Sequence, residues 1–346
     1  MPLTVILGTI VAYALFSSEG IGFALLIGAI LAPTDAALGL PIFANPRMPV
    51  RIRRALSIES GLNDGLATLL VTLFIALAVE EQHAAQGGWL FDSLSEIGLG
   101  IFVGVIGGLV GGRLFVTAVA NNWTTTTAQR VGNLAMALGI YFSALSVGGN
   151  GFVAAFADGL VFGEVARFRL HEATEFTEES GTALSMLVWT IFGTSLVAPL
   201  VRALEPRAFV FAIVALTIVR MVPVAISLIG TGFRKDTLLV MGWLGPRGLA
   251  SVIFMLIAVD TLRASKLEVE ALTKMAGWAI VLSVLLHAIT PAPLAAWYAR
   301  RLENAASEVP ELLPVYELAA HESPGKHRSF GTHLNLMKDH HVEANS

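Results

Sequence analysis

Ten apolar segments, separated by short polar stretches, occupy most of the first 300 residues and constrain the fold more than any other feature. We place them at 3–17, 20–43, 56–79, 96–118, 131–147, 150–164, 182–202, 207–229, 237–260 and 276–299. A helix needs about 20 mainly apolar residues to cross a bilayer, so the pattern predicts an all-α, multi-pass membrane protein. Only 14% of the residues are charged, against about 25% in a water-soluble domain.

Composition also excludes several classes of protein. The chain has no cysteine, which rules out disulfides, thiol chemistry and thiolate metal sites. Its net charge of −4 gives no sign of a nucleic-acid partner. No Ser, His or metal-ligand cluster has the spacing of an intramembrane hydrolase, and we interpret the lone His287 as a packed histidine. We therefore expect neither an enzyme nor a bound cofactor.

The distribution of basic residues predicts the orientation. With ten spans both termini share one side of the membrane, and the first loop on that side, 47–54, is rich in arginine. The opposite loops at 81–92 and 148–149 carry no Lys or Arg, although the bias weakens later in the chain. Because basic loops stay in the cytoplasm, we expect both termini there and the chain in a bacterial inner membrane.

The composition changes after Leu302. We divide the chain into a transmembrane domain at 1–302 and a cytoplasmic tail at 303–346, which lacks the apolar surface to fold alone. The histidines of this tail could form a weak metal site, but a solvated tail is the favoured interpretation. They are His321, His327, His333, His340 and His341.

Three carboxylates fall inside the apolar segments. Asp35 lies in the second segment, and Glu59 and Asp64 lie in the third. A carboxylate at membrane depth costs about 2.5–3.5 kcal/mol, so each is a candidate functional group. Ser60 and Asp64, four residues apart, face the same side of a helix, and Glu59 and Asn63 share the neighbouring face. For Glu59 a polar helix start is the alternative interpretation, whereas a long apolar run follows Asp64 directly.

Two segments contain helix-breaking residues. Pro33 removes a backbone hydrogen bond from the second segment, and the ninth carries Gly-Pro-Arg-Gly at 245–248. Two broken helices in corresponding halves indicate the site of a transporter built from inverted repeats. Among the last six segments, the broken one is the fifth. Among the first three segments, the broken one is only the second. Segment order therefore predicts that three leading helices are missing from a protein of about thirteen spans.

Four stretches give the chain a resemblance to a known family. Residues 31–36 (LAPTDA), 59–65 (ESGLNDG), 152–163 (FVAAFADGLVFG) and 245–248 (GPRG) resemble motifs of the bacterial sodium/proton antiporters of the first cation:proton antiporter family, relatives of animal sodium/hydrogen exchangers. The resemblance covers roughly residues 1–300 and implies an all-α sodium/proton antiporter fold, with inverted repeats and two discontinuous crossing helices. Asp158 departs from the family pattern. Asp158 has two possible interpretations: its carboxylate faces a lumen, or the residue lies near the end of a helix.

Position by position, the resemblance implies a set of ligands. Asp64 would be the principal carboxylate for the ion and the proton. Asp35 and Ser60 would add oxygen ligands to the monovalent cation, and Thr34 would contribute its hydroxyl or its carbonyl oxygen.

The resemblance also implies supporting roles. Asn63 would hold the crossing helices by hydrogen bonds, and in this family Asn at that place accompanies one-for-one, electroneutral exchange. Glu59 would pair with an arginine across the core. Arg220 fits that role best, while Arg247 is the competitor or else stabilises the broken ninth helix. Pro33 would belong to the unwound stretch of the second apolar segment.

These expectations describe a secondary active transporter that exchanges Na⁺ for H⁺ by alternating access, with Li⁺ or K⁺ as alternative cations. We expect it to form a homodimer in the lipid bilayer. An unperturbed Asp pKa of about 3.9 is too low for a proton to compete with sodium near neutral pH. Burial and a neighbouring like charge would have to favour the protonated form of the site. A cation channel and a truncated remnant that transports nothing are the two other hypotheses.

Overall fold

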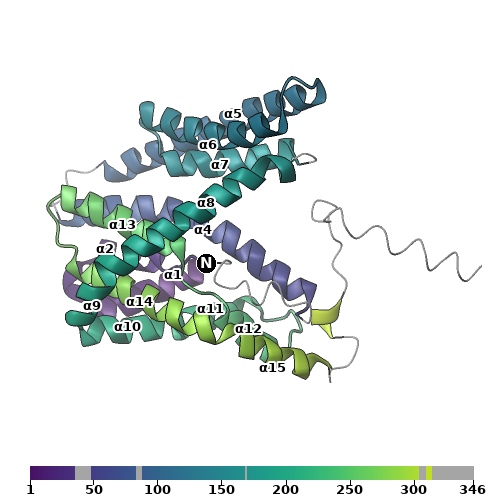
Figure 1. Cartoon of the computed structure of the whole chain (residues 1–346). Helices are drawn as coiled ribbons and strands as arrows, with labels where there is room; N and C mark the ends of the chain where they lie inside the picture. Colours follow the sequence, from purple (N-terminus) through teal and green to yellow (C-terminus); the bar gives the residue numbers. More distant parts are fainter. Residues whose placement is uncertain (36–47, 83–87, 168–169, 304–308, 314–346) are drawn as a thin grey trace, which may run out of the picture. The chain divides into compact units, whose positions relative to one another are not determined.

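The structure is a computed structural model that describes residues 1–35, 48–82, 88–167, 170–303 and 309–313. All regular secondary structure in these ranges is helical, as predicted (Figure 1). Met1–Leu313 form one compact unit. Most of the predicted tail, and the last third of the predicted span 20–43, lie outside the described residues.

The helices follow the predicted spans closely in the first half of the chain. They are α1 (Pro2–Leu15), α2 (Ile21–Ile30), α4 (Val50–Gln82), α5 (Trp89–Ala120), α6 (Thr126–Ser146) and α7 (Gly151–Val165), with the short turn Ser17–Glu19 between α1 and α2. Helix α4 begins well before residue 56, because its arginine-rich start is helical although it is not apolar. An apolar window therefore underestimates the length of the helix.

The second half contains more interruptions. Helix α8 (Leu170–Phe192) continues through a π-helical turn (Gly193–Val197) into α9 (Ala198–Arg202). The remaining helices are α10 (Pro206–Leu216), α11 (Ile218–Ser227), α12 (Lys235–Trp243), α13 (Leu249–Ala264), α14 (Glu270–Ile289) and α15 (Pro291–Glu303), followed by the turn Pro310–Leu312. The single span predicted at 276–299 was wrong, since the chain forms α14 and α15. Proline disfavours a helical residue before it, so α14 ends ahead of Pro291.

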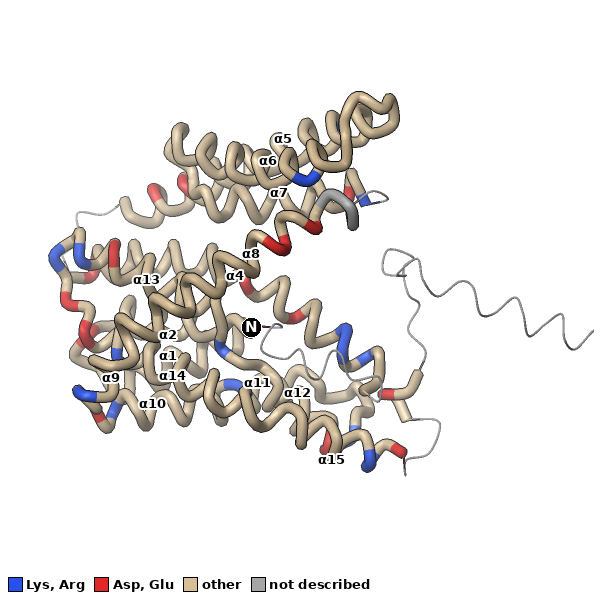
Figure 2. The backbone as a smooth tube through the Cα atoms, in the orientation of Figure 1, with Lys and Arg blue, Asp and Glu red and all other residues tan. Residues whose placement is uncertain are grey.

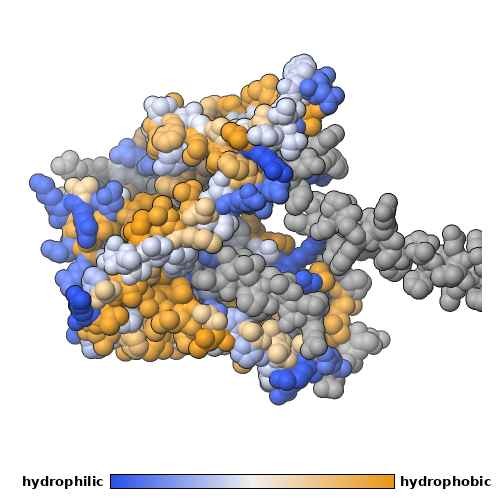
Figure 3. Space-filling view, in the orientation of Figure 1, coloured by the Kyte–Doolittle hydropathy of each residue, from blue (hydrophilic) through white to orange (hydrophobic). Residues whose placement is uncertain are grey.

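Five helical stretches among the described residues are long and apolar enough to cross a membrane. They are Val50–Gln82, Trp89–Ala120, Thr174–Arg202, Pro206–Ser227 and Glu270–Ile289. Many of their large apolar side chains are exposed, for example Phe102, Leu114 and Leu184, and Figure 3 shows hydrophobic residues over much of the visible face. An apolar surface of this extent marks contact with a partner or a membrane, and helices of this length suit a bilayer.

The helices pack in two groups that meet at α4. Helices α5, α6 and α7 contact one another, while α1, α2, α10, α13 and α14 surround the largest buried core (Figure 1). Helix α4 contacts α2 and α13 from the second group and α5 and α7 from the first. Most Lys and Arg residues lie at helix ends (Figure 2), so a charge inside the core stands out.

Helices α5 and α7 approach each other through a row of glycines on α5. Gly100, Gly104, Gly108 and Gly112 recur every fourth residue, and a Cβ added at Gly104 would overlap the carbonyl oxygen of Ala154 on α7. Membrane helices use small residues in this way to bring two backbones together.

We expect Gly104→Ala to lower the stability of the detergent-purified protein by about 1–3 kcal/mol, because the overlapping atom belongs to backbone and cannot rotate away. Gly98→Ala is the matched control on the same helix, where nothing lies within 4 Å of an added Cβ. Alanine also has the better helix propensity, so this control should melt at the parent temperature or above. Equal melting of the two variants would contradict the close approach.

The compact unit extends past residue 302. Glu311 is buried and accepts hydrogen bonds from the Thr237 hydroxyl (2.5 Å) and the Arg234 backbone N–H (2.8 Å) at the start of α12. Arg51 on α4 donates to the Pro310 carbonyl oxygen at 2.8 Å. The turn Pro310–Leu312 therefore connects the starts of α4 and α12.

Candidate cation site

Two helices are interrupted where proline and glycine occur in the sequence. Helix α2 ends at Ile30, and residues 31–35 leave the helical path around Pro33. Helix α12 ends at Trp243 and α13 begins at Leu249, with Pro246 between them. Each break leaves backbone N–H and C=O groups without helical partners, and a buried break must satisfy them in another way.

The two interrupted segments bond to each other. The Asp35 backbone N–H donates to the Pro246 carbonyl oxygen at 2.8 Å, and the Leu249 N–H at the start of α13 donates to the Asp35 Oδ2 at 3.0 Å. The Ser251 hydroxyl donates to the Ile30 carbonyl oxygen at 2.8 Å. A Cβ at Gly248 would overlap the Asp35 side chain, so glycine allows this approach. The predicted crossing of two discontinuous helices is present in the described residues.

Arg247 stabilises both breaks. Its side chain is fully buried, and its Nη1 donates to the carbonyl oxygens of Ala32 (2.9 Å) and Pro33 (3.1 Å), which the break in α2 leaves without helical partners. Its backbone N–H donates to the Ser283 hydroxyl of α14 at 2.7 Å. Of the two roles that the sequence left open for Arg247, these contacts are those of the helix stabiliser.

Arg220 pairs with Glu59. Both terminal nitrogens of Arg220 donate to the two carboxylate oxygens of Glu59, with an Nη2–Oε2 distance of 2.9 Å. The Arg220 side chain is 3% exposed and that of Glu59 is 28% exposed. A Cβ at Gly245 would overlap the Arg220 guanidinium, so the second break also makes room for this pair. This is the partner that the sequence favoured for Glu59.

Asp64 lies one turn after the contact between α4 and the α2 break. The Ser60 hydroxyl donates to the Thr34 carbonyl oxygen, which brings the unwound stretch onto the face that carries Asp64. The Asp64 Oδ1 is buried and has no hydrogen-bond partner among the described residues. The charges of Asp35 and Asp64 repel each other across this space. Carboxylate, hydroxyl and carbonyl oxygens therefore gather where one carboxylate is left unpaired.

The structure also bears on Asn63 and on one of the two alternatives for Asp158. The Asn63 Nδ2 is buried without a hydrogen-bond partner among the described residues, so the predicted bond from this nitrogen to a crossing helix is absent there. Asp158 is not near a helix end. It lies seven residues from either end of α7 (158 − 151 = 7; 165 − 158 = 7), 3% exposed, with its Oδ1 unpartnered.

Ser283 and His287 on α14 support the second break, a role that the sequence interpretation missed. The His287 Nδ1 bonds the Ser283 carbonyl oxygen (2.9 Å), and its Nε2 bonds the Trp243 carbonyl oxygen (2.8 Å) at the end of α12. His287 is thus a packed histidine, as interpreted, and it also supports the second break. The polar residues four apart on an apolar helix were the available signal.

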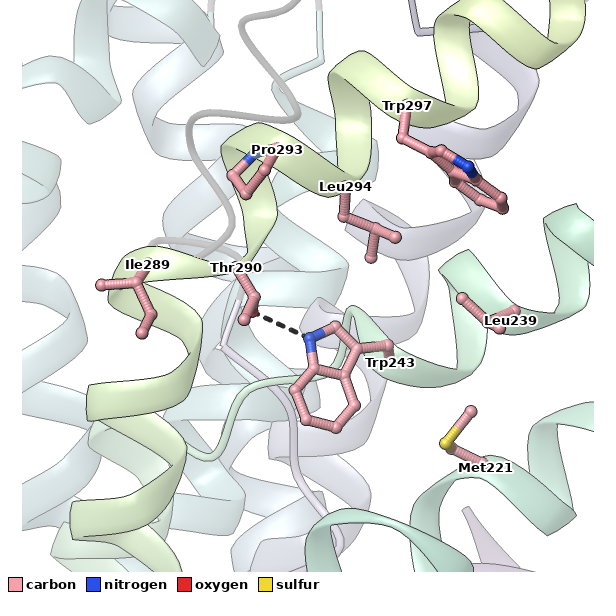
Figure 4. A pocket seen from close by; sticks show the side chains of 8 residues that line it. All are labelled: Met221, Leu239, Trp243, Ile289, Thr290, Pro293, Leu294 and Trp297. Carbon is pink, nitrogen blue, oxygen red and sulfur yellow. Dashed lines mark hydrogen bonds between the residues drawn. The ribbon is translucent and has the colours of Figure 1, made fainter.

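An apolar cavity of about 560 Å³ lies beside the end of α12 (Figure 4). Its lining consists of Met221, Leu239, Trp243, Ile289, Thr290, Pro293, Leu294 and Trp297. The Trp243 Nε1 donates to the Thr290 hydroxyl at 2.9 Å, which occupies the indole donor of Trp243. A cavity with this lining lacks the oxygen ligands that a hard cation requires, so it is distinct from the candidate cation site.

Comparisons with known proteins agree with this arrangement. The K(+)/H(+) antiporter NhaP of Alkalimonas amylolytica is 28% identical over 312 residues, which are 86% of this chain and 51% of that protein. The Na(+)/H(+) antiporter ApNhaP of Aphanothece halophytica is 25% identical over 257 residues, 68% of this chain and 47% of that protein. The chain thus spans about half the length of these curated relatives.

A solved structure has the same fold. The sodium proton antiporter MjNhaP1 from Methanocaldococcus jannaschii, determined at pH 8, aligns with a TM-score of 0.68 and 20% identity over 86% of this chain and 77% of that one. The family described as "Sodium/hydrogen exchanger, transmembrane" matches residues 1–297, nearly all of the compact unit. The chain therefore belongs to the sodium/hydrogen exchanger transmembrane family.

Proposed function

We propose that this chain exchanges a monovalent cation for protons across a bacterial inner membrane, with Asp64 as the group for which the two compete. The observation that supports this most is the buried Asp64 oxygen left without a hydrogen-bond partner beside the crossed breaks. A structural carboxylate at such depth would be paired. A transport carboxylate needs a vacant oxygen for its substrate.

The ligands proposed for the cation are those that the breaks bring together. Asp64 and Asp35 supply charge, Ser60 supplies a hydroxyl, and Thr34 supplies a hydroxyl or its carbonyl oxygen. Such oxygen ligands suit hard cations. One cation or one proton neutralises the charge of Asp64, and the site passes the apolar barrier at low cost only when that charge is neutralised. Two binding equilibria thereby become obligatory exchange by alternating access.

Sodium is the favoured substrate, with lithium and potassium as alternatives, since the relatives include both Na(+)/H(+) and K(+)/H(+) antiporters. Asn63 next to Asp64 supports electroneutral exchange, because a second carboxylate there would carry a second charge. The loop charges support cytoplasmic termini, and a homodimer is the proposed assembly.

Dequenching of a pH-sensitive dye in acidified everted vesicles tests this function. We expect addition of Na⁺, and more weakly Li⁺ or K⁺, to raise the internal pH only in vesicles that contain the chain. Clamping the membrane potential to zero with an ionophore should leave an electroneutral rate unchanged. A conductive, potential-driven flux would favour a channel, and no flux in correctly inserted protein would favour a non-transporting remnant.

The competition also sets a pH dependence. If one proton excludes one cation, then below the titration point of the site the apparent cation KM should rise about tenfold for each unit that the pH falls, because each unit lowers the deprotonated fraction of the site about tenfold. The maximum rate at saturating cation should change little over the same range. A KM that is independent of pH would contradict competition at a single site.

A further inference from the structure

A second, smaller cavity lies between α4, α5, α6, α7 and α13. It has a volume of about 190 Å³, and its polar lining consists of Thr68, Thr72, Glu96, Tyr141 and Asn150. We call this cavity the Glu96 pocket. Since one water occupies about 30 Å³ in the liquid, the Glu96 pocket can hold an ion together with several waters. No polar group in it is used by the cation site described above.

The Glu96 pocket lies along the helix face that carries Asp64. Asp64, Thr68 and Thr72 follow one another at intervals of four residues on α4, and such residues share a face. The Thr68 hydroxyl donates to the Asp64 carbonyl oxygen at 3.0 Å. The polar side chains Thr68 and Thr72 of the pocket wall therefore share a helix face with Asp64.

Asn150 holds the carboxylate of the pocket in place. Its Nδ2 donates to the Thr72 hydroxyl at 3.0 Å and to the Glu96 Oε1 at 3.3 Å. Its backbone N–H donates to the Glu96 carbonyl oxygen at 3.0 Å, and its Oδ1 caps α7 by accepting from Val153 N–H at 3.1 Å. Glu96 thus faces a cavity from a fixed position, and no ion pair joins it to a basic residue of the described part of the chain.

We propose that the Glu96 pocket is a second cation site, in which a partly hydrated monovalent cation waits between the aqueous phase and Asp64. This inference rests on the proposed function. Glu96 supplies the negative charge, Thr68 and Thr72 supply hydroxyl oxygens, and Asn150 positions the carboxylate. Glu96 lies in the first part of α5 and Asn150 directly precedes α7, and the starts of these two helices are on the outer side in the proposed orientation.

The waiting site predicts an effect on one face of the membrane alone. A negative charge in a cleft with low-dielectric walls raises the local cation concentration by about tenfold or more. In sided proteoliposomes, Glu96→Gln should therefore raise the cation KM about tenfold on the outer face and leave the KM on the inner face and kcat within about twofold. Asp92→Asn is the matched control, one turn earlier on α5 and exposed, and its kinetics should equal those of the parent.

A binding measurement separates this proposal from the proposed function. The purified Asp64→Asn chain should still bind radioactive ²²Na⁺ weakly, and the Asp64→Asn/Glu96→Gln chain should not. Retention of that binding by the double variant, or an equal KM change on both faces, would overturn the waiting site. If the parent chain carries no exchange although the ²²Na⁺ binding depends on Glu96, the transport function fails and the cation site stands.

Discussion

Replacing Asp64 with Asn is expected to reduce cation-driven proton movement in vesicles to the level of vesicles without the chain. Asn has nearly the same shape, but it neither carries a charge for the cation nor takes up the exchanged proton. At a separation of 4 Å and an effective dielectric constant of about 20, one charge pair contributes roughly 4 kcal/mol. Loss of that term corresponds to about a thousandfold weaker cation binding, and loss of the proton acceptor removes the exchange altogether.

The stability of the Asp64→Asn chain separates loss of transport from loss of folding. The Asp64 Oδ1 has no hydrogen-bond partner among the described residues, so this oxygen contributes no hydrogen bond to the fold there. Removing an unpaired buried charge should not destabilise a protein, and the melting temperature in detergent should equal or exceed that of the parent. Asp260→Asn, an exposed carboxylate on α13, is the control and should transport normally. Normal exchange by Asp64→Asn would refute the assignment.

The sequence predicts most of the fold, because each apolar segment needs a helix in lipid and proline marks the breaks. Pro33 and Pro246 stand where α2 ends and where α12 and α13 separate. The break before Pro291 was missed, since the residues on either side of it remain apolar and a hydropathy window averages across them. Composition therefore locates apolar stretches better than it locates helix ends.

The candidate site was predictable where the family resemblance supplied a partner. It implied an arginine across the core from Glu59, with Arg220 as the best candidate, and Arg220 forms the ion pair with Glu59. The contacts of Arg247 were not predictable in this way. They depend on which carbonyl oxygens the break in α2 exposes and on the close approach that Gly248 allows, and both are tertiary facts.

The surroundings of Asn63 and Asp158 could not be predicted from the motif or from composition. The motif implied hydrogen bonds from Asn63 to a crossing helix, but its Nδ2 has no partner among the described residues. For Asp158, the sequence left a helix-end position open, whereas α7 continues for seven residues beyond it. In both cases the deciding quantity is the packing of neighbouring helices, which a single sequence does not contain.

Glu59→Gln is expected to destabilise the protein more than Arg220→Gln, although both remove the same ion pair. Glu59→Gln leaves the Arg220 guanidinium 3% exposed, with one long contact to the Met241 carbonyl oxygen at 3.5 Å. Arg220→Gln leaves a Glu59 side chain that is 28% exposed and therefore partly hydrated. Stranding a buried charge costs roughly 3–5 kcal/mol, so the first variant should approach that range and the second should fall below it.

The double replacement Glu59→Gln/Arg220→Gln should recover much of the lost stability, because neither charge is then left alone. Melting of the four proteins in detergent gives the coupling energy directly as a double-mutant cycle.

The exposed pair Arg130–Glu175, with side chains 39% and 48% exposed, is the control. There Glu175→Gln should cost less than about 1 kcal/mol, as exposed ion pairs do. If Glu59→Gln melts with the parent, or if the two single losses simply add in the double variant, the Glu59–Arg220 pair does not stabilise the core. Glu59 would then need another explanation.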